Sequence, residues 1–160
     1  MNINSLKMSN TYHQIYIHGV FAVKNRDARI GMSWKPKMMA VIGNLINETG
    51  STNILVNGVD DHTHCLFELK PSVSVSDVMK IAKSKSSKWL NESNLLRYHF
   101  EWQSGFGAFS YSNSQIDLLY KYILNQERHH QHQSFRDEYI ELLTKFNVNF
   151  DENYIFHDLI

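Results

Sequence analysis

The strongest structural signal in this sequence is a long run near the N-terminus, Tyr12 to Val23, in which aromatic and β-branched residues dominate. Such residues favour a strand over a helix. Two more strand-like runs follow at residues 54–59 and 62–69, separated only by a short turn around Asp60 and Asp61. That spacing predicts an antiparallel hairpin. The protein should therefore be organised around a β-sheet.

Helical patterns alternate with these strands. Apolar residues recur at helical spacing, with turn or capping residues at the ends, over residues 37–49, 77–91 and 113–128. Two short strand-like runs, 98–103 and 108–111, separate the second helix from the third, and an amphipathic helix is predicted near 136–146. Strands of mixed spacing among helices indicate an α+β fold, in which an antiparallel sheet has helices packed on one face.

Composition limits the class of protein. The chain has 160 residues, of which 42% are hydrophobic and 20% charged, values typical of one globular domain. No apolar run approaches the ~18 residues that a membrane span requires, and the first ten residues lack the basic and apolar segments of a signal peptide. The single Cys65 excludes an internal disulfide and a Cys-rich zinc site. We therefore expect a cytoplasmic protein that does not span a membrane.

The charges are distributed unevenly although the formal net charge is zero. Residues 1–39 contain six basic side chains against the single acid Asp27, and residues 70–97 contain six against two. The segment from residue 133 onward is acidic, with six acids against two bases. If the fold brings the two basic segments together, they form a phosphate-binding face. The alternative is a solvated surface on which the charges cluster by chance.

His62 and His64 form the sharpest local motif. Residues i and i+2 of a strand point to the same face, so both imidazoles could bind one divalent cation while Thr63 points the other way. Asp60 and Asp61 precede the pair and could supply a carboxylate. The alternative is that both histidines are polar residues on the solvated face of a half-buried strand.

Tyr122 and Gln126 are a possible second half of the same site. They are four residues apart on the predicted third helix, so their side chains lie on one face, beside the apolar stripe. Tyr120 falls inside that stripe with Ile116 and Ile123 and is expected in the core. A phenol beside a metal ion suits nucleophilic attack on phosphorus. Alternatively, Tyr122 lies at a packing boundary and Gln126 is solvated.

A third group of candidate ligands comprises His129, His130 and His132. Three histidines in four residues could bind zinc or nickel, but just beyond a helix they lack a fixed geometry. We expect them to be mostly solvated. The sequence contains no Walker loop, dinucleotide-binding glycine motif, serine-hydrolase elbow or zinc-protease motif, which leaves nucleotide-dependent and serine-hydrolase functions without support.

Four motifs occur in a characteristic order. They are the Asp-His-x-His strand at 61–64, the Ser- and Lys-rich helix at 74–90, the segment Trp102 to Gly107, and the Tyr-Ile-x-x-Gln helix at 122–126. Together they resemble the single-tyrosine HUH transposases of small insertion sequences and their relatives associated with repetitive extragenic palindromes. The resemblance covers roughly Tyr12 to His130. It implies an HUH single-tyrosine transposase domain over residues 1–132, with an acidic helical extension of the same domain at 133–160.

The resemblance implies a ferredoxin-like HUH sandwich and a role for each motif residue. His62 and His64 match the histidines that bind catalytic Mg²⁺ or Mn²⁺, Gln126 matches the residue that completes the metal site, and Tyr122 matches the nucleophile. Members of the family cut single-stranded DNA beside a hairpin, leave a 5′-phosphotyrosine and a free 3′-OH, need no nucleotide cofactor, and are typically homodimers. One departure is Thr63, because the family usually has a bulky hydrophobic residue there.

Basic side chains from both cationic segments are the expected DNA contacts. They are Lys24, Arg26, Arg29, Lys80, Lys83, Lys85 and Lys88. Aromatic residues such as Tyr98, Trp102 and Phe106 are available to stack on unpaired bases. Two alternatives to a transposase are a noncatalytic nucleic-acid-binding module on the same fold and a hydrolytic metal nuclease in which Tyr122 only positions a water molecule.

Overall fold

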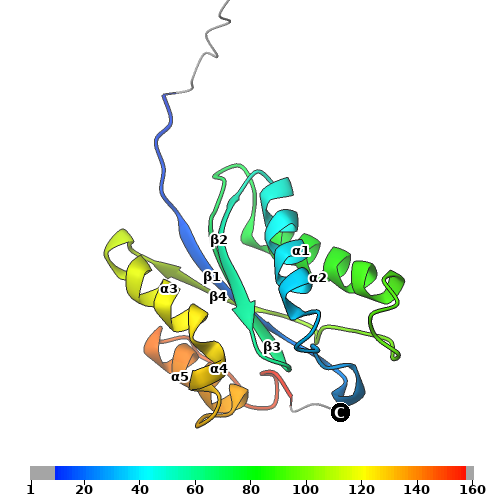
Figure 1. Ribbon diagram of the computed structural model, residues 1–160. Coiled ribbons are helices and arrows are strands. Elements are labelled where there is room, and N and C mark those ends of the chain that lie inside the picture. The colour runs from blue at the N-terminus through cyan, green and yellow to red at the C-terminus, as the bar shows by residue number, and fades with distance from the viewer. Residues whose placement is uncertain (1–9, 158–160) are drawn as a thin grey trace, which may run out of the picture.

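The computed structural model describes residues 10–157. Lys7, one of the basic residues of the N-terminal segment, therefore lies outside the described residues. The principal elements, in chain order, are β1 (Tyr16–Ala22), α1 (Lys35–Glu48), β2 (Thr52–Gly58), β3 (His62–Glu68), α2 (Val75–Glu92), β4 (Gly107–Tyr111), α3 (Ile116–Leu124), α4 (Gln126–His129) and α5 (Phe135–Lys145) (Figure 1). None of the described helices is long and apolar enough to cross a membrane.

The four strands form one antiparallel sheet in the order β2-β3-β1-β4. The predicted hairpin is β2 and β3, with Gly58 paired to Thr63. The α+β class with an antiparallel sheet is thus confirmed. Residues 98–103 were expected to form a strand but make only an isolated bridge between Trp102 and Val23. Burial of Phe100 and Trp102 in the core accounts for the aromatic, strand-like pattern of this segment.

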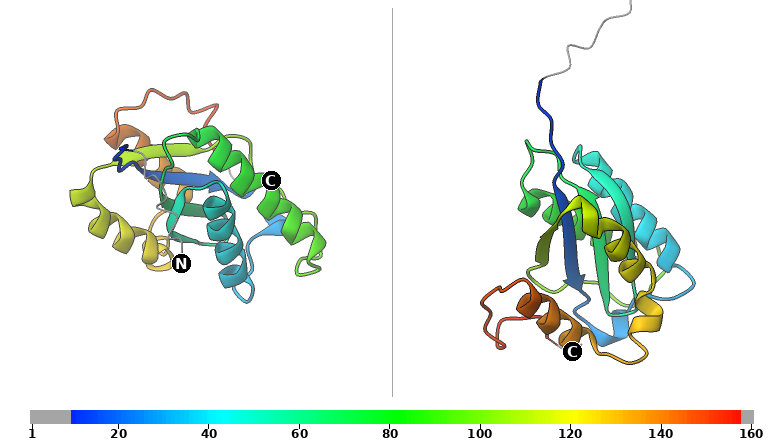
Figure 2. Two further views of the ribbon diagram at one scale, coloured as in Figure 1. Left: turned by 90° about the horizontal axis from the view of Figure 1, so that it is seen from above. Right: turned by 90° about the vertical axis from the view of Figure 1, so that its left-hand side faces the viewer.

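Helices cover both faces of the sheet. α1 and α2 pack on one face, as expected, whereas α3, α4 and α5 lie on the other (Figure 2). Along β1 and β3, successive side chains alternate between the two faces of the sheet. Gly19 faces α2, and a Cβ added at Gly19 would lie 2.7 Å from the Cys65 sulfur. His18, His62 and His64 face the opposite way. The histidines therefore lie beneath the helices of the C-terminal half.

The predicted third helix is divided. A 3₁₀ turn, Asn113–Gln115, leads into α3, and the chain departs from helical geometry at Asn125 (φ −94°, ψ 22°) before α4 begins at Gln126. The prediction that Tyr120 lies in the core is wrong, because 38% of its surface is exposed. α3 packs on the sheet through Leu119 and Ile123. Tyr120 is rotated by about 100° from Leu119 around the helix axis and so points away from the sheet.

Thr63 provides a first test of packing. It is completely buried on the α1–α2 face, and its hydroxyl has no hydrogen-bond partner among residues 10–157. A buried, unsatisfied hydroxyl is destabilising, and valine has the same shape without it. We expect Thr63→Val to raise the free energy of unfolding by about 1 kcal/mol, as measured by urea denaturation. A variant equal to or less stable than the wild type would contradict this packing.

Candidate active site

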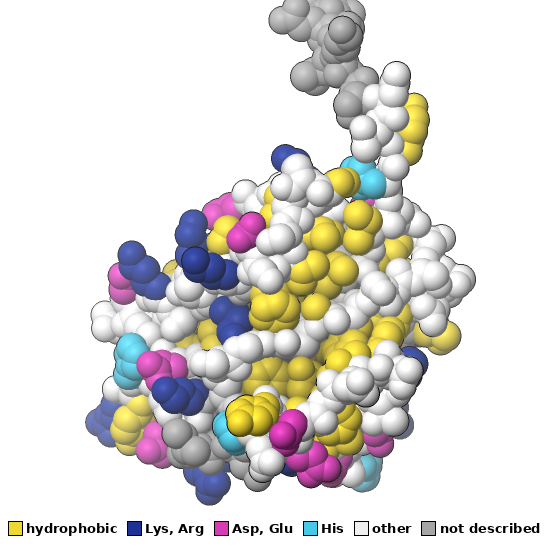
Figure 3. Space-filling model, turned by 180° about the vertical axis from the view of Figure 1, so that it is seen from behind, with side chains coloured by type: hydrophobic (Ala, Val, Ile, Leu, Met, Phe, Trp, Pro, Cys, Tyr) yellow, Lys and Arg dark blue, Asp and Glu magenta, His cyan; other side chains and the backbone are white. Residues whose placement is uncertain are grey.

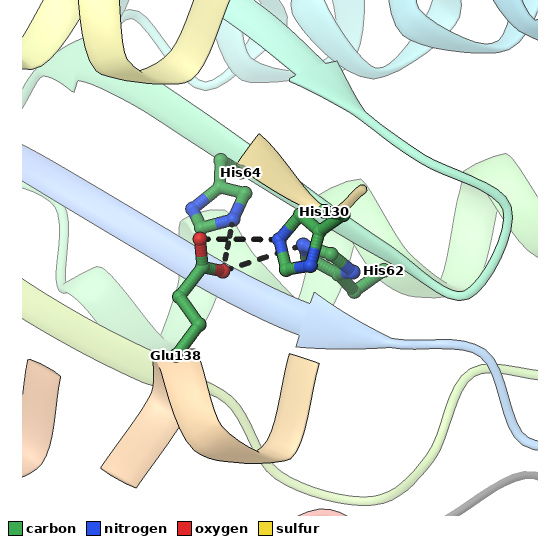
Figure 4. A group of neighbouring side chains, drawn as sticks. All are labelled: His62, His64, His130 and Glu138. Atoms are coloured by element: carbon green, nitrogen blue, oxygen red, sulfur yellow. Dashed lines mark hydrogen bonds and ion pairs between the residues drawn. The ribbon is translucent and has the colours of Figure 1, made fainter. Parts of the chain in front are cut away.

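His62 and His64 project from β3 towards α5, and both are fully buried. Their Nε2 atoms converge on Oε1 of Glu138, at 3.4 Å from His62 and 3.0 Å from His64. The expected same-face geometry is therefore present (Figure 4). The alternative prediction, that both histidines lie on a solvated face, is wrong because neither side chain is exposed.

His130 is a third histidine in this cluster. Its Nε2 lies 3.1 Å from Oε2 of Glu138, and only 9% of its side chain is exposed. Its Nδ1 donates a hydrogen bond to the carbonyl of Gln133 at 2.8 Å. The expectation of a mostly solvated histidine group is thus wrong for His130, because the chain turns after α4 and directs this ring inwards. It is also wrong for His129, whose side chain is 33% exposed and whose Nε2 lies 3.2 Å from Oε2 of Glu138. It holds for His132, which is exposed.

Tyr122 and Gln126 reach the same centre from α3 and α4. The Tyr122 hydroxyl donates a hydrogen bond to Oε2 of Glu138, and its ring centroid lies 5.9 Å from that of His64. The Gln126 side chain is fully buried; its Oε1 lies 3.1 Å from Nε2 of His62, and its Nε2 donates to Glu138 at 3.2 Å. The structure therefore brings together all four residues that the motifs singled out.

Glu138 was not predicted from the sequence, although it contacts every other residue of the cluster. It lies on α5, in the acidic segment where the sequence predicts an amphipathic helix but no site residue. Its position in the sequence offered one sign that it is buried, because it falls within the apolar stripe of Phe135, Tyr139 and Leu142. In the structure this stripe is buried, and Glu138 is 1% exposed. A carboxylate on the apolar face of an amphipathic helix requires a buried polar partner.

The electrostatics of the cluster follow from burial and from these contacts. Burial alone would raise the pKa of Glu138, but hydrogen bonds from His130, His62 and His64 outweigh it and hold the pKa far below its usual value. Burial lowers the pKa of His64 to about 4. It also raises the pKa of Tyr122, and the negative charge of Glu138 raises it further. At neutral pH the cluster thus combines an ionised carboxylate, a neutral His64 and a protonated phenol.

The donor set fits a divalent cation. One ligand atom from each of His62, His64, His130 and Glu138 lies within 4.8 Å of the other three. Imidazole nitrogens together with carboxylate and amide oxygens are ligands for Mn²⁺, Zn²⁺ and, through the oxygens, Mg²⁺. This arrangement could hold a metal ion beside a tyrosine hydroxyl.

The expected DNA-contacting residues separate into three groups. Lys24, Lys80 and Lys83 line one groove of about 830 Å³ together with Trp102 and Phe106. Arg26 and Arg29 line a second groove, of about 490 Å³, next to Asp61 and His130. Lys85 and Lys88 lie outside both grooves, on exposed parts of α2, at 4.0 Å from Glu48 and Glu92 respectively.

Several of these basic side chains have close partners within the protein, including Arg29, whose guanidinium lies 3.2 Å from the Asp60 carboxylate. The Lys83 ammonium group donates to the carbonyls of Gln103 and Gly105, and burial lowers its pKa. Lys24 forms an ion pair of 2.8 Å with Glu101. Figure 3 shows Lys and Arg side chains gathered along one side of the molecule. The N-terminal and α2 basic segments therefore meet in part, through Lys24 and Lys80.

Comparisons with known structures support the fold. A crystal structure of a transposase candidate from Deinococcus radiodurans matches with a TM-score of 0.58 and 16% identity, covering 75% of this chain and 96% of that one. A REP-associated tyrosine transposase bound to a REP hairpin matches with a TM-score of 0.56 and 13% identity, covering 96% of this chain and 93% of that one. No curated protein matches the sequence.

The family is established by the sequence itself. The model of IS200-like transposases matches residues 11–126, which is more than half of the chain. The matched segment includes β1, the histidine strand β3 and the tyrosine helix α3, and it ends at Gln126. All four candidate motifs therefore lie within the segment that matches the family, and the chain belongs to the IS200-like transposases.

Proposed function

We propose that this transposase is metal-dependent and cuts and rejoins single-stranded DNA next to hairpins through a 5′-phosphotyrosine intermediate. One observation carries the proposal: the Tyr122 hydroxyl and the Nε2 atoms of His62 and His64 all contact the carboxylate of Glu138. A nucleophile and a pair of metal ligands thus share one small centre. A hydrolytic nuclease would need the ligands but would not need the phenol at that place.

In this proposal His62, His64 and Gln126 hold Mg²⁺ or Mn²⁺. When bound, the cation polarises the scissile phosphate. Glu138 and His130 are close enough to serve as further ligands. Asp61 accepts a hydrogen bond from Nδ1 of His62 at 2.6 Å, which fixes the ring with Nε2 directed at the centre.

Tyr122 acts as the nucleophile. Its oxygen forms a bond to phosphorus while the bond from phosphorus to the 3′ oxygen breaks, and the released 3′ oxygen gains a proton. The phenol gives up its own proton, which balances the proton gained by the 3′ oxygen, and the hydrogen bond to Glu138 holds the hydroxyl in place for the attack. The phosphodiester bond energy is retained on the enzyme, so a later attack by a 3′-OH can rejoin the strand without a nucleotide cofactor.

The DNA substrate is proposed from chemistry and from one relative. Phosphates would contact Lys24, Arg26, Arg29 and the basic face of α2, and unpaired bases could stack on Trp102 or Phe106 in the groove beside them. A structural neighbour is bound to a REP hairpin, which supports hairpin DNA as the partner here. We further propose a cytoplasmic homodimer, as the resemblance implies.

The proposal is tested by incubating the protein with single-stranded DNA that contains hairpins from its own genomic flanks. In the presence of Mg²⁺ a covalent protein–DNA species should persist on a denaturing gel, and EDTA should abolish it. A noncatalytic binding module would shift the DNA on a native gel only. A metal nuclease would release cut DNA with multiple turnovers and leave no adduct. Cleavage that EDTA does not affect would refute the metal assignment.

A further inference from the structure

His18 lies directly behind His64, on the side away from Glu138. It is fully buried on β1, and its ring stacks on that of His64 at a centroid distance of 5.0 Å and an interplanar angle of 19°. Nε2 of His18 lies 2.8 Å from Nδ1 of His64. The rings of Phe109 and Tyr111 also pack around His18, with centroid distances of 6.0 and 5.9 Å respectively. Within the described part of the chain, the site residues whose rings contact His18 are His64 and Tyr122, the latter edge-on at a centroid distance of 6.5 Å.

The three histidines of the cluster each have a partner on Nδ1. His62 has the carboxylate of Asp61, His130 has the carbonyl of Gln133, and His64 has His18. A carboxylate and a carbonyl can only accept, so they fix the proton on Nδ1 and leave Nε2 for the metal. An imidazole differs because it can either donate or accept. The orientation of the His18–His64 hydrogen bond is thus not fixed by His18 alone.

Without a cation, Glu138 fixes that orientation. Its carboxylate accepts from Nε2 of His64 at 3.0 Å, so the proton of the neutral His64 ring is on Nε2 and its Nδ1 accepts. His18 must then donate from Nε2, which leaves its own Nδ1 without a proton. That atom is buried and has no hydrogen-bond partner among residues 10–157. Without a proton it is an unpaired acceptor, which costs less than the unpaired donor that it becomes once a cation is bound, so the binding of the cation must outweigh that cost.

With a cation the orientation must reverse. A metal ion on His64 takes the Nε2 lone pair, so the ring proton has to be on Nδ1. We propose that His18 is a positioning residue that accepts this proton's hydrogen bond, and that the two rings exchange tautomers together when a divalent cation binds. The proton on Nε2 of His18 passes to Nδ1 of His64, the proton that the cation displaces from Nε2 of His64 goes to solvent, and His18 binds one proton from solvent at Nδ1. Neither ring changes its charge, and the pair gains or loses no proton overall.

This inference rests on the proposed metal site but not on DNA cleavage, so it is tested without DNA. His18→Phe retains the ring stack and removes the hydrogen bond. Glutamine at this position can offer either an oxygen or an amide group to His64. We expect His18→Phe to bind Mn²⁺ about 10- to 100-fold more weakly than wild type in a calorimetric titration. His18→Gln should recover most of that affinity. His99→Phe is the matched control, because the His99 side chain is 70% exposed.

Nitrogen-15 NMR of the imidazole rings of the wild-type protein gives a second readout that needs no variant. The metal-free protein should show protons on Nε2 of both His18 and His64. One equivalent of Zn²⁺, used as a diamagnetic probe, should move both protons to Nδ1. A His18 ring that keeps its Nε2 proton in the zinc-loaded protein would overturn the proposal, as would a folded His18→Phe protein with wild-type Mn²⁺ affinity.

The same measurements separate this inference from the proposed function. Tautomer exchange and weakened Mn²⁺ binding in His18→Phe would support the role of His18 even if the wild-type protein formed no DNA adduct. Conversely, a wild-type protein that forms the adduct but shows no tautomer exchange would refute the role of His18 and leave the transposase assignment intact.

Discussion

Tyr122→Phe should reduce the covalent protein–DNA adduct by at least about 1000-fold, because the variant lacks the only oxygen of this side chain that can attack phosphorus. The fold should persist. The ring remains, and the lost hydrogen bond to Glu138 costs about 1 kcal/mol of stability. Hairpin binding should also persist, since the expected phosphate contacts lie on other elements. Denaturing electrophoresis measures the adduct, and a native gel shift measures binding.

Tyr120→Phe is the matched control for this experiment. Tyr120 lies two positions away on the same helix, has 38% of its surface exposed and points away from the sheet that carries His62 and His64. It should form the adduct at the wild-type rate. An adduct that survives in Tyr122→Phe and disappears in Tyr120→Phe would show that the other tyrosine is the nucleophile.

Loss of either strand histidine should have the second-largest effect. His62→Ala and His64→Ala each remove one imidazole from the proposed metal site, and we expect Mg²⁺-dependent cleavage to fall by more than about 100-fold. Mn²⁺ affinity, measured by calorimetry, should fall with it. Glu138 keeps its other hydrogen-bond donors in each variant, so circular dichroism should still show a folded protein.

His132→Ala controls for the removal of a histidine near the site. This residue is exposed, and its loss should change neither cleavage nor Mn²⁺ affinity. The metal assignment would fail if folded His62→Ala or His64→Ala protein cleaved hairpin DNA at the wild-type rate.

Local periodicity was sufficient to predict the residues that share an element. His62 and His64 are two apart on a strand, and Tyr122 and Gln126 are four apart, so each pair could be placed on one face from the sequence alone. The meeting of the two pairs was implied by the family resemblance. Tyr120 shows the limit of the method, because a wide apolar stripe does not fix which of its edges faces the sheet.

Residues contributed by tertiary contacts could not be predicted in this way. Glu138 enters the centre because α5 packs across the sheet, with Tyr139 against Gly107 of β4. His130 enters because the chain turns back after α4. His18 lies on a neighbouring strand, and its pairing with His64 depends on the register of β1 against β3. Each of these positions follows from long-range packing, which sequence periodicity does not encode.

The most direct measurement is peptide mapping of the adduct by mass spectrometry, after the protein has reacted with hairpin DNA in Mg²⁺ and the DNA has been digested. The account predicts a nucleotide joined through a 5′ phosphate to the Tyr122 oxygen and to no other residue. A nucleotide on a different side chain, or no modified peptide from a sample that cleaves its DNA, would contradict it.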